Sequence, residues 1–207
     1  MKVDVLPIGL YEENVVILHE GKHVLVFDPG RNAKQIMETI AKDETVDAII
    51  LTHGHDDHTG AVDDMADQYE CPVYIHPGDE SMIRMKGSAA TGGTMSPVYT
   101  ETEPLREGTM IIGPFSLTVY HTPGHTPGSV CIRCRSVLIS GDTLFAGSIG
   151  RMDFFGGSEE DMIRSLQMLW NLDDDLKVIP GHGPSTTIGH EKQVNWYFRR
   201  AEAGLAL

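Results

Sequence analysis

The feature that most constrains this chain is the segment HGHDDH at residues 53–58, which places three histidines and two aspartates within six residues. Imidazole and carboxylate groups are ligands for borderline divalent metals, whereas a hydrophobic core has no use for such a cluster. The run before it, residues 46–51, is apolar and β-branched, which predicts a buried strand. We therefore expect a rigid strand that ends at a metal-binding loop.

Three later segments have the same arrangement, with a potential ligand beside a glycine directly after an apolar stretch. Loops that follow strands converge over a rigid scaffold, so these segments are expected to meet the first loop in space. The candidates suffice for two metal ions. Taken together they are His53, His55, Asp57, His58, His125, Asp142 and His182.

The order of these residues resembles the metallo-β-lactamase-fold hydrolases, whose signature is His-x-His-x-Asp-His followed by a distant His, an Asp and a last His. The match spans well over half of the chain. The segments GDTLFAGSIGR at residues 141–151 and PGHGP at residues 180–184 are similar to the glyoxalase II branch, which hydrolyses glutathione thioesters. The ending TTIGHEK at residues 186–192 is similar to the short, single-domain members of that branch.

The resemblance implies an α/β fold, the four-layer αββα sandwich, and the chain length suits one domain over residues 1–207. The residue pattern agrees with this layering, because clusters of strands alternate with helices. A helix beginning after the N-cap Ser158 is predicted from its acidic first turn. The other expected helices cover residues 33–42, 59–68 and 188–198, and the expected strands cover residues 2–6, 14–19, 23–27, 46–51, 73–75, 110–112, 115–120, 130–134, 137–140 and 176–179.

Transferred residue by residue, the resemblance implies that Asp142 bridges two divalent ions and that Asp57 and Asp142 are catalytic. Zinc is the expected metal, with iron or manganese as alternatives, because His and Asp suit all three. Two such ions share a water and lower its pKa, and the resulting hydroxide attacks the thioester carbonyl. The implied ligand sets are His53, His55 and His125 for the first ion, and Asp57, His58 and His182 for the second.

Substrate contacts are expected from the loop after the bridging aspartate. In glyoxalase II enzymes a basic residue at this place touches glutathione, and Arg151 stands there in this chain. Two further segments are expected to wall the site. One is residues 87–102, a glycine-rich stretch predicted to be either a mobile lid or a disordered insertion, and the other is the stretch around Trp196, Tyr197 and Arg199.

Other activities on the same ligand set stay open. Lactonases and persulfide dioxygenases share much of it, and a dioxygenase would use a single iron. A metal-binding module without turnover is a third possibility. An Asp at position 142 disfavours the zinc β-lactamases that carry Cys there, and a His at position 55 disfavours flavodiiron proteins, which carry Glu.

The formal net charge of −14 disfavours nucleic-acid binding, which depends on basic side chains, so a small-molecule thioester is the expected partner. No stretch approaches the roughly 18 apolar residues of a membrane span, and no signal peptide is visible. The three cysteines, Cys71, Cys131 and Cys134, give no disulfide framework, so a cytoplasmic location is expected. The oligomeric state stays open.

Residues beside the motifs are given minor roles. Positions i and i+3 of a strand face opposite ways, so Cys131 and Cys134 are predicted to be ordinary buried thiols rather than a redox or zinc pair. Asp56 is expected to face solvent or a neighbouring helix cap. His121 is expected to point away from His125 toward no obvious partner, or to support a ligand, and Gly54 to allow close backbone approach.

Overall fold

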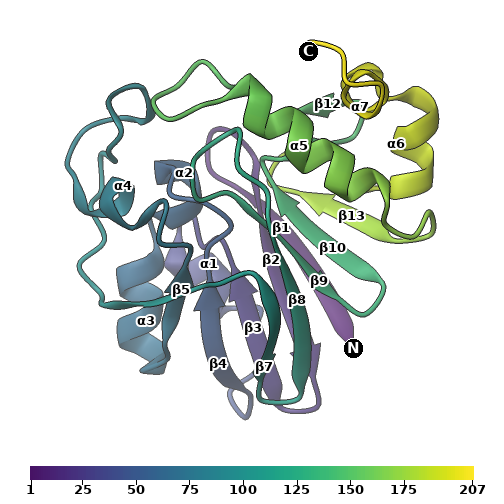
Figure 1. Cartoon of the computed structure of the whole chain (residues 1–207). Helices are drawn as coiled ribbons and strands as arrows, with labels where there is room; N and C mark the ends of the chain where they lie inside the picture. The colour runs from purple at the N-terminus through teal and green to yellow at the C-terminus, as the bar shows by residue number, and fades with distance from the viewer.

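The computed structural model describes all 207 residues and shows two mixed six-stranded sheets packed face to face, with helices on both outer faces (Figure 1). Antiparallel pairing at one end of the first sheet gives way to parallel pairing from the third strand onward. In spatial order the first sheet contains β1 (Lys2–Ile8), β2 (Glu13–Glu20), β3 (His23–Phe27), β4 (Thr45–Ile50), β5 (Val73–Ile75) and β6 (Thr102–Pro104).

The only parallel pair of the second sheet is formed by its second and third strands, β13 and β10. The spatial order of this sheet is β14 (Thr186–Thr187), β13 (Lys177–Pro180), β10 (Val137–Gly141), β9 (Val130–Cys134), β8 (Phe115–His121) and β7 (Gly108–Ile112). A separate hairpin of β11 (Leu144–Phe145) and β12 (Ser148–Ile149) follows β10. The parallel pairing matters for function because it brings the carboxyl ends of β10 and β13 to the same edge.

Helices cover the two outer faces in separate groups (Figure 1). On the side of the first sheet are α1 (Ala33–Met37), α2 (Asp56–Thr59), α3 (Val62–Tyr69) and α4 (Glu80–Arg84). On the side of the second sheet are α5 (Glu159–Trp170), α6 (Ile188–Val194) and α7 (Trp196–Glu202). None of the helices combines the length and the apolar character that crossing a membrane requires.

Apolar side chains form three layers, as a four-layer sandwich requires. Strand β2 shows how: Val15 and Ile17 pack outward under α1 and α3, whereas Val16 and Leu18 pack into the space between the sheets. The third layer lies between the second sheet and α5–α7. A strand buried on both faces reads as a continuous apolar run, which is why β2 lacks polar alternation. The predicted αββα fold is confirmed.

Three predicted helices differ at their ends. The first stops at Met37 rather than at residue 42. The second begins at Val62 rather than at residue 59, since Thr59 ends the short helix α2 and Gly60, where a Cβ would lie 2.5 Å from the carbonyl oxygen of Gly30, lies between the two helices. The closing helix is split at Asn195, whose backbone is extended and whose side chain accepts a hydrogen bond from the N–H of Phe198. In these places tertiary contacts and a capping side chain set the helix ends, although the apolar periodicity of the sequence predicts a longer helix.

Two other expectations can be compared with the structure. Cys131 packs in the outer layer and Cys134 in the central layer, so the two thiols lie on opposite faces of β9, as predicted. Residues 87–102 contain a 3₁₀ turn, Ala89–Thr91, and are tied to α4 because the guanidinium of Arg84 donates to the carbonyl oxygens of Val98 and Thr100 at 2.7 Å. The structure favours a packed wall over a disordered insertion.

Candidate metal centre

Four strand ends deliver the seven candidate ligands to one place. The loop after β4 carries His53 to His58, and the loops after β8, β10 and β13 carry one candidate each. Because β10 and β13 are parallel neighbours, their following loops are held side by side, with the N–H of Gly181 donating to the carbonyl oxygen of Gly141 at 2.8 Å. Every predicted ligand therefore lies at the same edge of the sandwich.

The first triad consists of His53, His55 and His125, all buried. The Nδ1 atom of His55 lies 3.1 Å from Nε2 of His53 and 2.9 Å from Nε2 of His125. Burial, together with the neighbouring histidines, holds the pKa of His53 well below its ordinary value and lowers that of His55 to about 3. Both side chains are therefore neutral at physiological pH, which is the form of imidazole that binds a metal.

The second triad consists of Asp57, His58 and His182, and it is less enclosed. Nε2 of His182 lies 3.3 Å from Nε2 of His58 and 3.4 Å from Oδ2 of Asp57. Burial alone would lower the pKa of His58, but Asp142 and Asp28 outweigh it and raise that pKa well above the ordinary value. At His182, too, burial lowers the pKa and Asp57 raises it, and the net result is a raised pKa.

Asp142 lies between the two triads. Its Oδ1 is 3.5 Å from Nε2 of His58, and its Oδ2 is 3.5 Å from Nε2 of His125 and 3.7 Å from Nε2 of His182. A Cβ at Gly181 would lie 2.2 Å from that Oδ1, so any side chain at position 181 would fill the space where the triads meet. One carboxylate thus faces both sets of ligands.

The side chains present fit a pair of divalent cations. Oδ1 of Asp142 is buried without a hydrogen-bond partner, an arrangement that is costly unless something else satisfies it. Ring nitrogens that face one another at about 3 Å are likewise best satisfied by a shared cation. Imidazole and carboxylate donors suit zinc, iron and manganese, so the donor set alone does not choose between them.

Sequence reasoning missed two buried aspartates that support the triads. Asp28 accepts hydrogen bonds from the backbone and hydroxyl of Thr52, at 2.7 and 2.6 Å, and lies 3.0 Å from Nδ1 of His58. A carboxylate on the second ring nitrogen fixes the orientation of a ligand histidine. The only sign of Asp28 in the sequence is a charged residue directly after an apolar run, a pattern that marks the end of a strand and does not indicate a contact with His58.

Asp79 supports the first triad by holding the loops that carry its histidines. Its carboxylate accepts hydrogen bonds from the N–H of Gly54 at 2.9 Å, from the hydroxyl of Thr126 at 2.7 Å and from the N–H of Gly128 at 2.6 Å. It therefore links the loop of His53 and His55 to the loop of His125. A Cβ at Gly54 would lie 3.2 Å from Cβ of Asp79, in keeping with the close approach expected at that glycine.

Two minor expectations need correction. Asp56 does not face solvent or a helix cap: it accepts hydrogen bonds from Thr94 at 2.6 Å, Ser96 at 2.9 Å and Arg31 at 2.5 Å, and so ties residues 87–102 to the metal-binding loop. His121 does have a partner, because its ring stacks on that of His76 with centroids 4.0 Å apart. Both contacts join segments far apart in the sequence, where no local pattern announces them.

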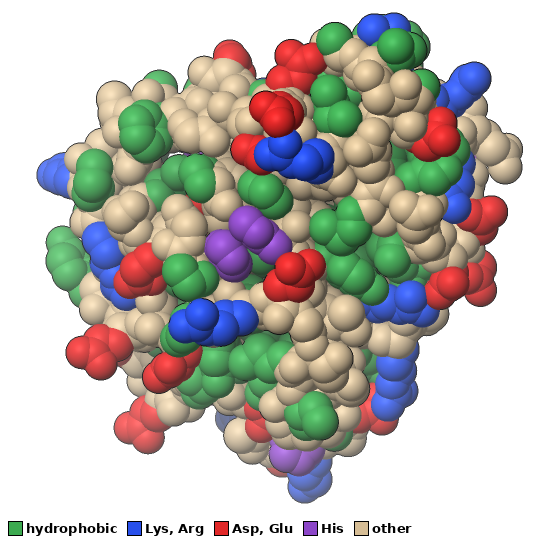
Figure 2. Space-filling view, in the orientation of Figure 1, with side chains coloured by type: hydrophobic (Ala, Val, Ile, Leu, Met, Phe, Trp, Pro, Cys, Tyr) green, Lys and Arg blue, Asp and Glu red, His purple; other side chains and the backbone are tan.

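A cavity of about 480 Å³ opens onto the two triads. Figure 2 shows histidine side chains near the centre of one face of the molecule, with basic side chains above and below them. Arg151 lines the cavity, and its guanidinium is paired with Asp153 at 2.6 Å and stacked over the ring of Phe154 at 3.9 Å. The lining residues are Tyr11, Arg31, His55, Asp56, Asp57, Ser88, Ala89, Met95, Arg151, Phe154 and His182.

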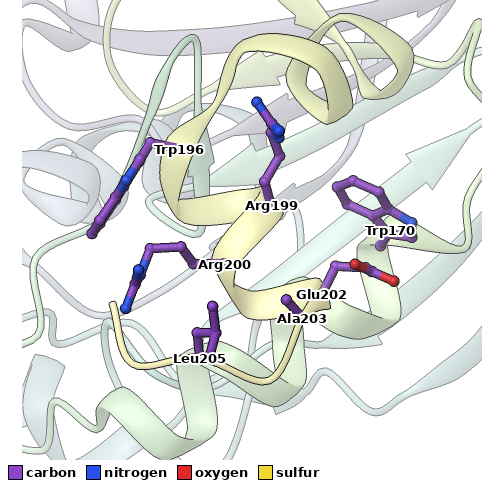
Figure 3. A pocket seen from close by; sticks show the side chains of 7 residues that line it. All are labelled: Trp170, Trp196, Arg199, Arg200, Glu202, Ala203 and Leu205. Atoms are coloured by element: carbon purple, nitrogen blue, oxygen red, sulfur yellow. The ribbon is translucent and has the colours of Figure 1, made fainter.

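Of the two segments expected to wall the site, residues 87–102 do so, through Ser88, Ala89 and Met95. The expectation for the C-terminal stretch is wrong. Trp196 and Arg199 line a different cavity, of about 560 Å³, which shares no residue with the first (Figure 3). Helix α7 packs on the outer face of the second sheet, and the residues that close the metal-side cavity come instead from turns near the N-terminus and from the loop after β12.

Comparisons with known proteins agree with this geometry. The model of the metallo-beta-lactamase superfamily matches residues 8–182. A probable metallo-hydrolase, YqgX, of Bacillus subtilis is 35% identical, over 94% of this chain and 96% of its own length. The hydroxyacylglutathione hydrolase GloC of Haemophilus influenzae is 32% identical, over 94% of this chain and 97% of its own length.

Two solved structures are similar over almost the whole chain. The BLEG-1 B3 metallo-beta-lactamase superposes with a TM-score of 0.88 at 35% identity, over 95% of this chain and 99% of that one. TTHA1623, solved in a di-iron-bound form, superposes with a TM-score of 0.85 at 34% identity, over 94% of this chain and 100% of that one. With its αββα layers and its paired triads, the chain belongs to the metallo-β-lactamase superfamily.

Proposed function

We propose that the protein is a metal-dependent hydrolase of thioesters of the glutathione type. One observation carries the proposal: the Asp142 carboxylate lies between two triads of potential ligands, and members of both triads, His55, Asp57 and His182, line a cavity large enough for a small molecule. Similarity to a hydroxyacylglutathione hydrolase over nearly the full length supports the choice of thioesters among the reactions open to this superfamily.

The chain's own residues account for most of the reaction. Two divalent cations, proposed to be zinc, would lower the pKa of water and stabilise negative charge on the carbonyl oxygen. Burial alone would raise the pKa of Asp57, but His182 and His58 lower it well below its usual range, so Asp57 is ionised and available as a ligand. Asp142 is proposed to hold both cations at once and to fix their separation.

In the proposed reaction the oxygen of a water molecule bonds to the thioester carbonyl carbon, and the carbon–sulfur bond breaks to release a carboxylic acid and a thiol. A thiol of pKa about 8.5 leaves without a strong general acid. No nucleophilic side chain is needed, and Cys131 is fully buried, with a pKa raised by burial to about 11. The three cysteines are free, which suits a reducing compartment, and we propose a cytoplasmic enzyme.

The thiol carrier is proposed to lie beside Arg151. The backbone carbonyl oxygen of Arg151 accepts a hydrogen bond from Nδ1 of His125 at 2.7 Å, so the loop that carries the guanidinium is anchored to the first triad. Replacing Arg151 with Ala should raise KM for a glutathione thioester severalfold and change kcat little, as expected when binding is lost equally from substrate and transition state. An equal fall in kcat and kcat/KM would place Arg151 at the reacting bond instead.

A panel of substrates tests the activity. The metal-loaded enzyme is assayed with S-lactoylglutathione, a lactone, a β-lactam and glutathione persulfide, and oxygen uptake is recorded for the last. We expect thioester hydrolysis to dominate. Oxygen consumption with the persulfide and no thioester cleavage would assign a dioxygenase, preferential lactone or β-lactam opening would assign those activities, and silence throughout with metal bound would indicate a non-catalytic module.

A further inference from the structure

The cavity contains two arginines, and they lie on different sides of the metal centre. Arg151 belongs to the side of the first triad, because its neighbour Phe154 has its ring 5.9 Å from that of His55. Arg31 is paired with Asp56, which stands between His55 of the first triad and Asp57 of the second, and the turn after β1 places it on the side of the second triad.

This placement of Arg31 rests on the turn after β1. A Cβ on Gly9 would lie 3.5 Å from Cδ of Arg31, so the turn packs against that side chain. Two residues later, the carbonyl oxygen of Tyr11 accepts a hydrogen bond from Nδ1 of His182 at 2.9 Å. Arg31 and Tyr11 therefore form one wall of the cavity next to the second triad.

The two arginines differ in how much of their hydrogen-bonding capacity is used. Arg151 commits both Nε and Nη2 to Asp153. Arg31 donates through Nη2 alone, to Asp56, and the Asp56 carboxylate is shared with Thr94 and Ser96. A guanidinium has five N–H donors, so Arg31 keeps most of its planar fork available for another carboxylate or phosphate.

We propose that Arg31 binds a carboxylate on the acyl half of the substrate, so that monothioesters of dicarboxylic acids are the preferred substrates. The inference rests on the proposed thioester hydrolysis. If the thiol carrier lies at Arg151 and the carbonyl over the triads, the acyl chain extends toward Arg31. Water then adds across the carbon–sulfur bond and releases a dicarboxylic acid and the thiol. In a chain of net charge −14, a guanidinium at this wall with N–H donors left over from its pairing with Asp56 is a local attraction for such an anion.

The test compares a glutaryl thioester with its neutral amide analogue, glutaramoyl, on the same thiol, because the two acyl groups differ in charge but scarcely in shape. The metal-loaded wild type should show a kcat/KM about tenfold higher for the glutaryl substrate, the size of one partly exposed charge-assisted hydrogen-bonding pair. Arg31→Gln should bring the ratio of the two values close to one, and Arg31→Lys should keep part of the preference.

Two further variants test whether the change in this ratio is specific to Arg31. Arg151→Gln should lower kcat/KM for both substrates and leave their ratio intact, because it is proposed to contact the thiol carrier. Arg164→Gln removes the same charge from the exposed face of α5, where Arg164 pairs with Glu160, and should also leave the ratio intact. Free glutarate, tested as a competitive inhibitor, should bind Arg31→Gln about tenfold more weakly than wild type.

The outcomes separate this inference from the function on which it rests. Equal hydrolysis of both substrates by the wild type, or an undiminished preference in Arg31→Gln, would overturn the role of Arg31 and leave thioester hydrolysis standing. Failure to hydrolyse either substrate together with S-lactoylglutathione would overturn thioester hydrolysis itself, whereas hydrolysis of S-lactoylglutathione alone would overturn only the role of Arg31. If Arg31→Gln is too unstable to purify, the ratio in Arg31→Lys decides, and an unchanged ratio there together with unchanged glutarate binding counts against the inference.

Discussion

The two triads are built from similar residues, but their surroundings shift the pKa values of their histidines in opposite directions. The first, His53, His55 and His125, gathers three buried imidazoles with no carboxylate of its own, and burial keeps His53 and His55 neutral. The second contains Asp57, and at His58 and His182 the surrounding carboxylates overcome the effect of burial and raise the pKa of each ring. In the first triad the low pKa values favour neutral imidazoles at His53 and His55, whereas in the second the raised pKa values favour the protonated rings of His58 and His182.

The difference comes from where the carboxylates lie. His58 has Asp28 at 3.0 Å, Asp142 at 3.5 Å and Glu13 at 3.9 Å. Glu13 is itself buried, its pKa is raised by burial, and neither of its carboxylate oxygens has a hydrogen-bond partner. Histidines can therefore be set to different protonation states by the carboxylates around them, which at His58 are chiefly Asp142 and Asp28. Four predictions test this contrast, beginning with the residue that the triads share.

Removing the shared carboxylate should erase the contrast altogether. Asp142→Ala is expected to leave less than about half an equivalent of metal per chain after loading and to lower thioester hydrolysis by about a thousandfold or more, because both cations lose a ligand. Elemental analysis and initial rates measure the two effects. Asp173→Ala, at an exposed position paired with Arg133, is the matched control and should keep both metals. Two tightly held metals in Asp142→Ala would show that the triads are independent.

Removing one ligand from each triad should separate the sites. His182→Ala should retain about one equivalent of metal, held by the first triad, and His125→Ala should lose that site preferentially; each change should lower hydrolysis by about a hundredfold. Isothermal titration of the metal-free proteins with zinc measures both sites in one experiment. If the two variants lose the same site, the division into triads is incorrect.

The supporting aspartates should each act on one triad. Asp28→Asn should weaken metal binding at the second triad, and Asp79→Asn should weaken binding at the first, each by about tenfold to a hundredfold, because both orient ligands without touching the cation. Zinc competition against a chelator measures each affinity. Asp63→Asn, which alters a half-buried aspartate that caps the backbone of Tyr99 and Thr100, is the control. Equal losses at both sites from either variant would mean general loosening of the fold.

The smallest expected effect is in pH dependence. A raised pKa means that His58 in the metal-free protein keeps its proton to higher pH than a free imidazole, and a cation must displace that proton. Affinity at the second triad should therefore rise with pH, by up to about tenfold per unit for each proton released, and level off above the raised pKa. His53 and His55 are already neutral, so affinity at the first triad should rise less steeply with pH than affinity at the second, between about pH 6 and 8. Metal titrations across this pH range measure the affinity of each triad. The same pH dependence at both triads would show that they do not differ in protonation.

Much of the fold was predictable because it follows from local patterns. Apolar β-branched runs indicated nearly all the long strands within a few residues, and the acidic turn after Ser158 indicated α5, whose N-cap bond from Asp161 is present. Short elements such as β6, β14 and α4 carry too few residues for any period to show. Helix interruptions at Gly60 and Asn195 depend on contacts with distant segments, which a period of 3.6 residues does not encode.

By itself the sequence determined which side chains gather at the centre, because imidazoles and carboxylates placed directly after strands must follow those strands to a common edge. Only the tertiary structure decided what surrounds them. Asp28, Asp56 and Asp79 read as ordinary charged residues until folding brings each against a partner at least 24 positions away. The same holds for Arg31 at the cavity wall and for Trp196 away from it. Long-range hydrogen bonds and burial are properties of the folded chain, so the gathering of the seven side chains could be predicted while their protonation and the walls of the cavity could not.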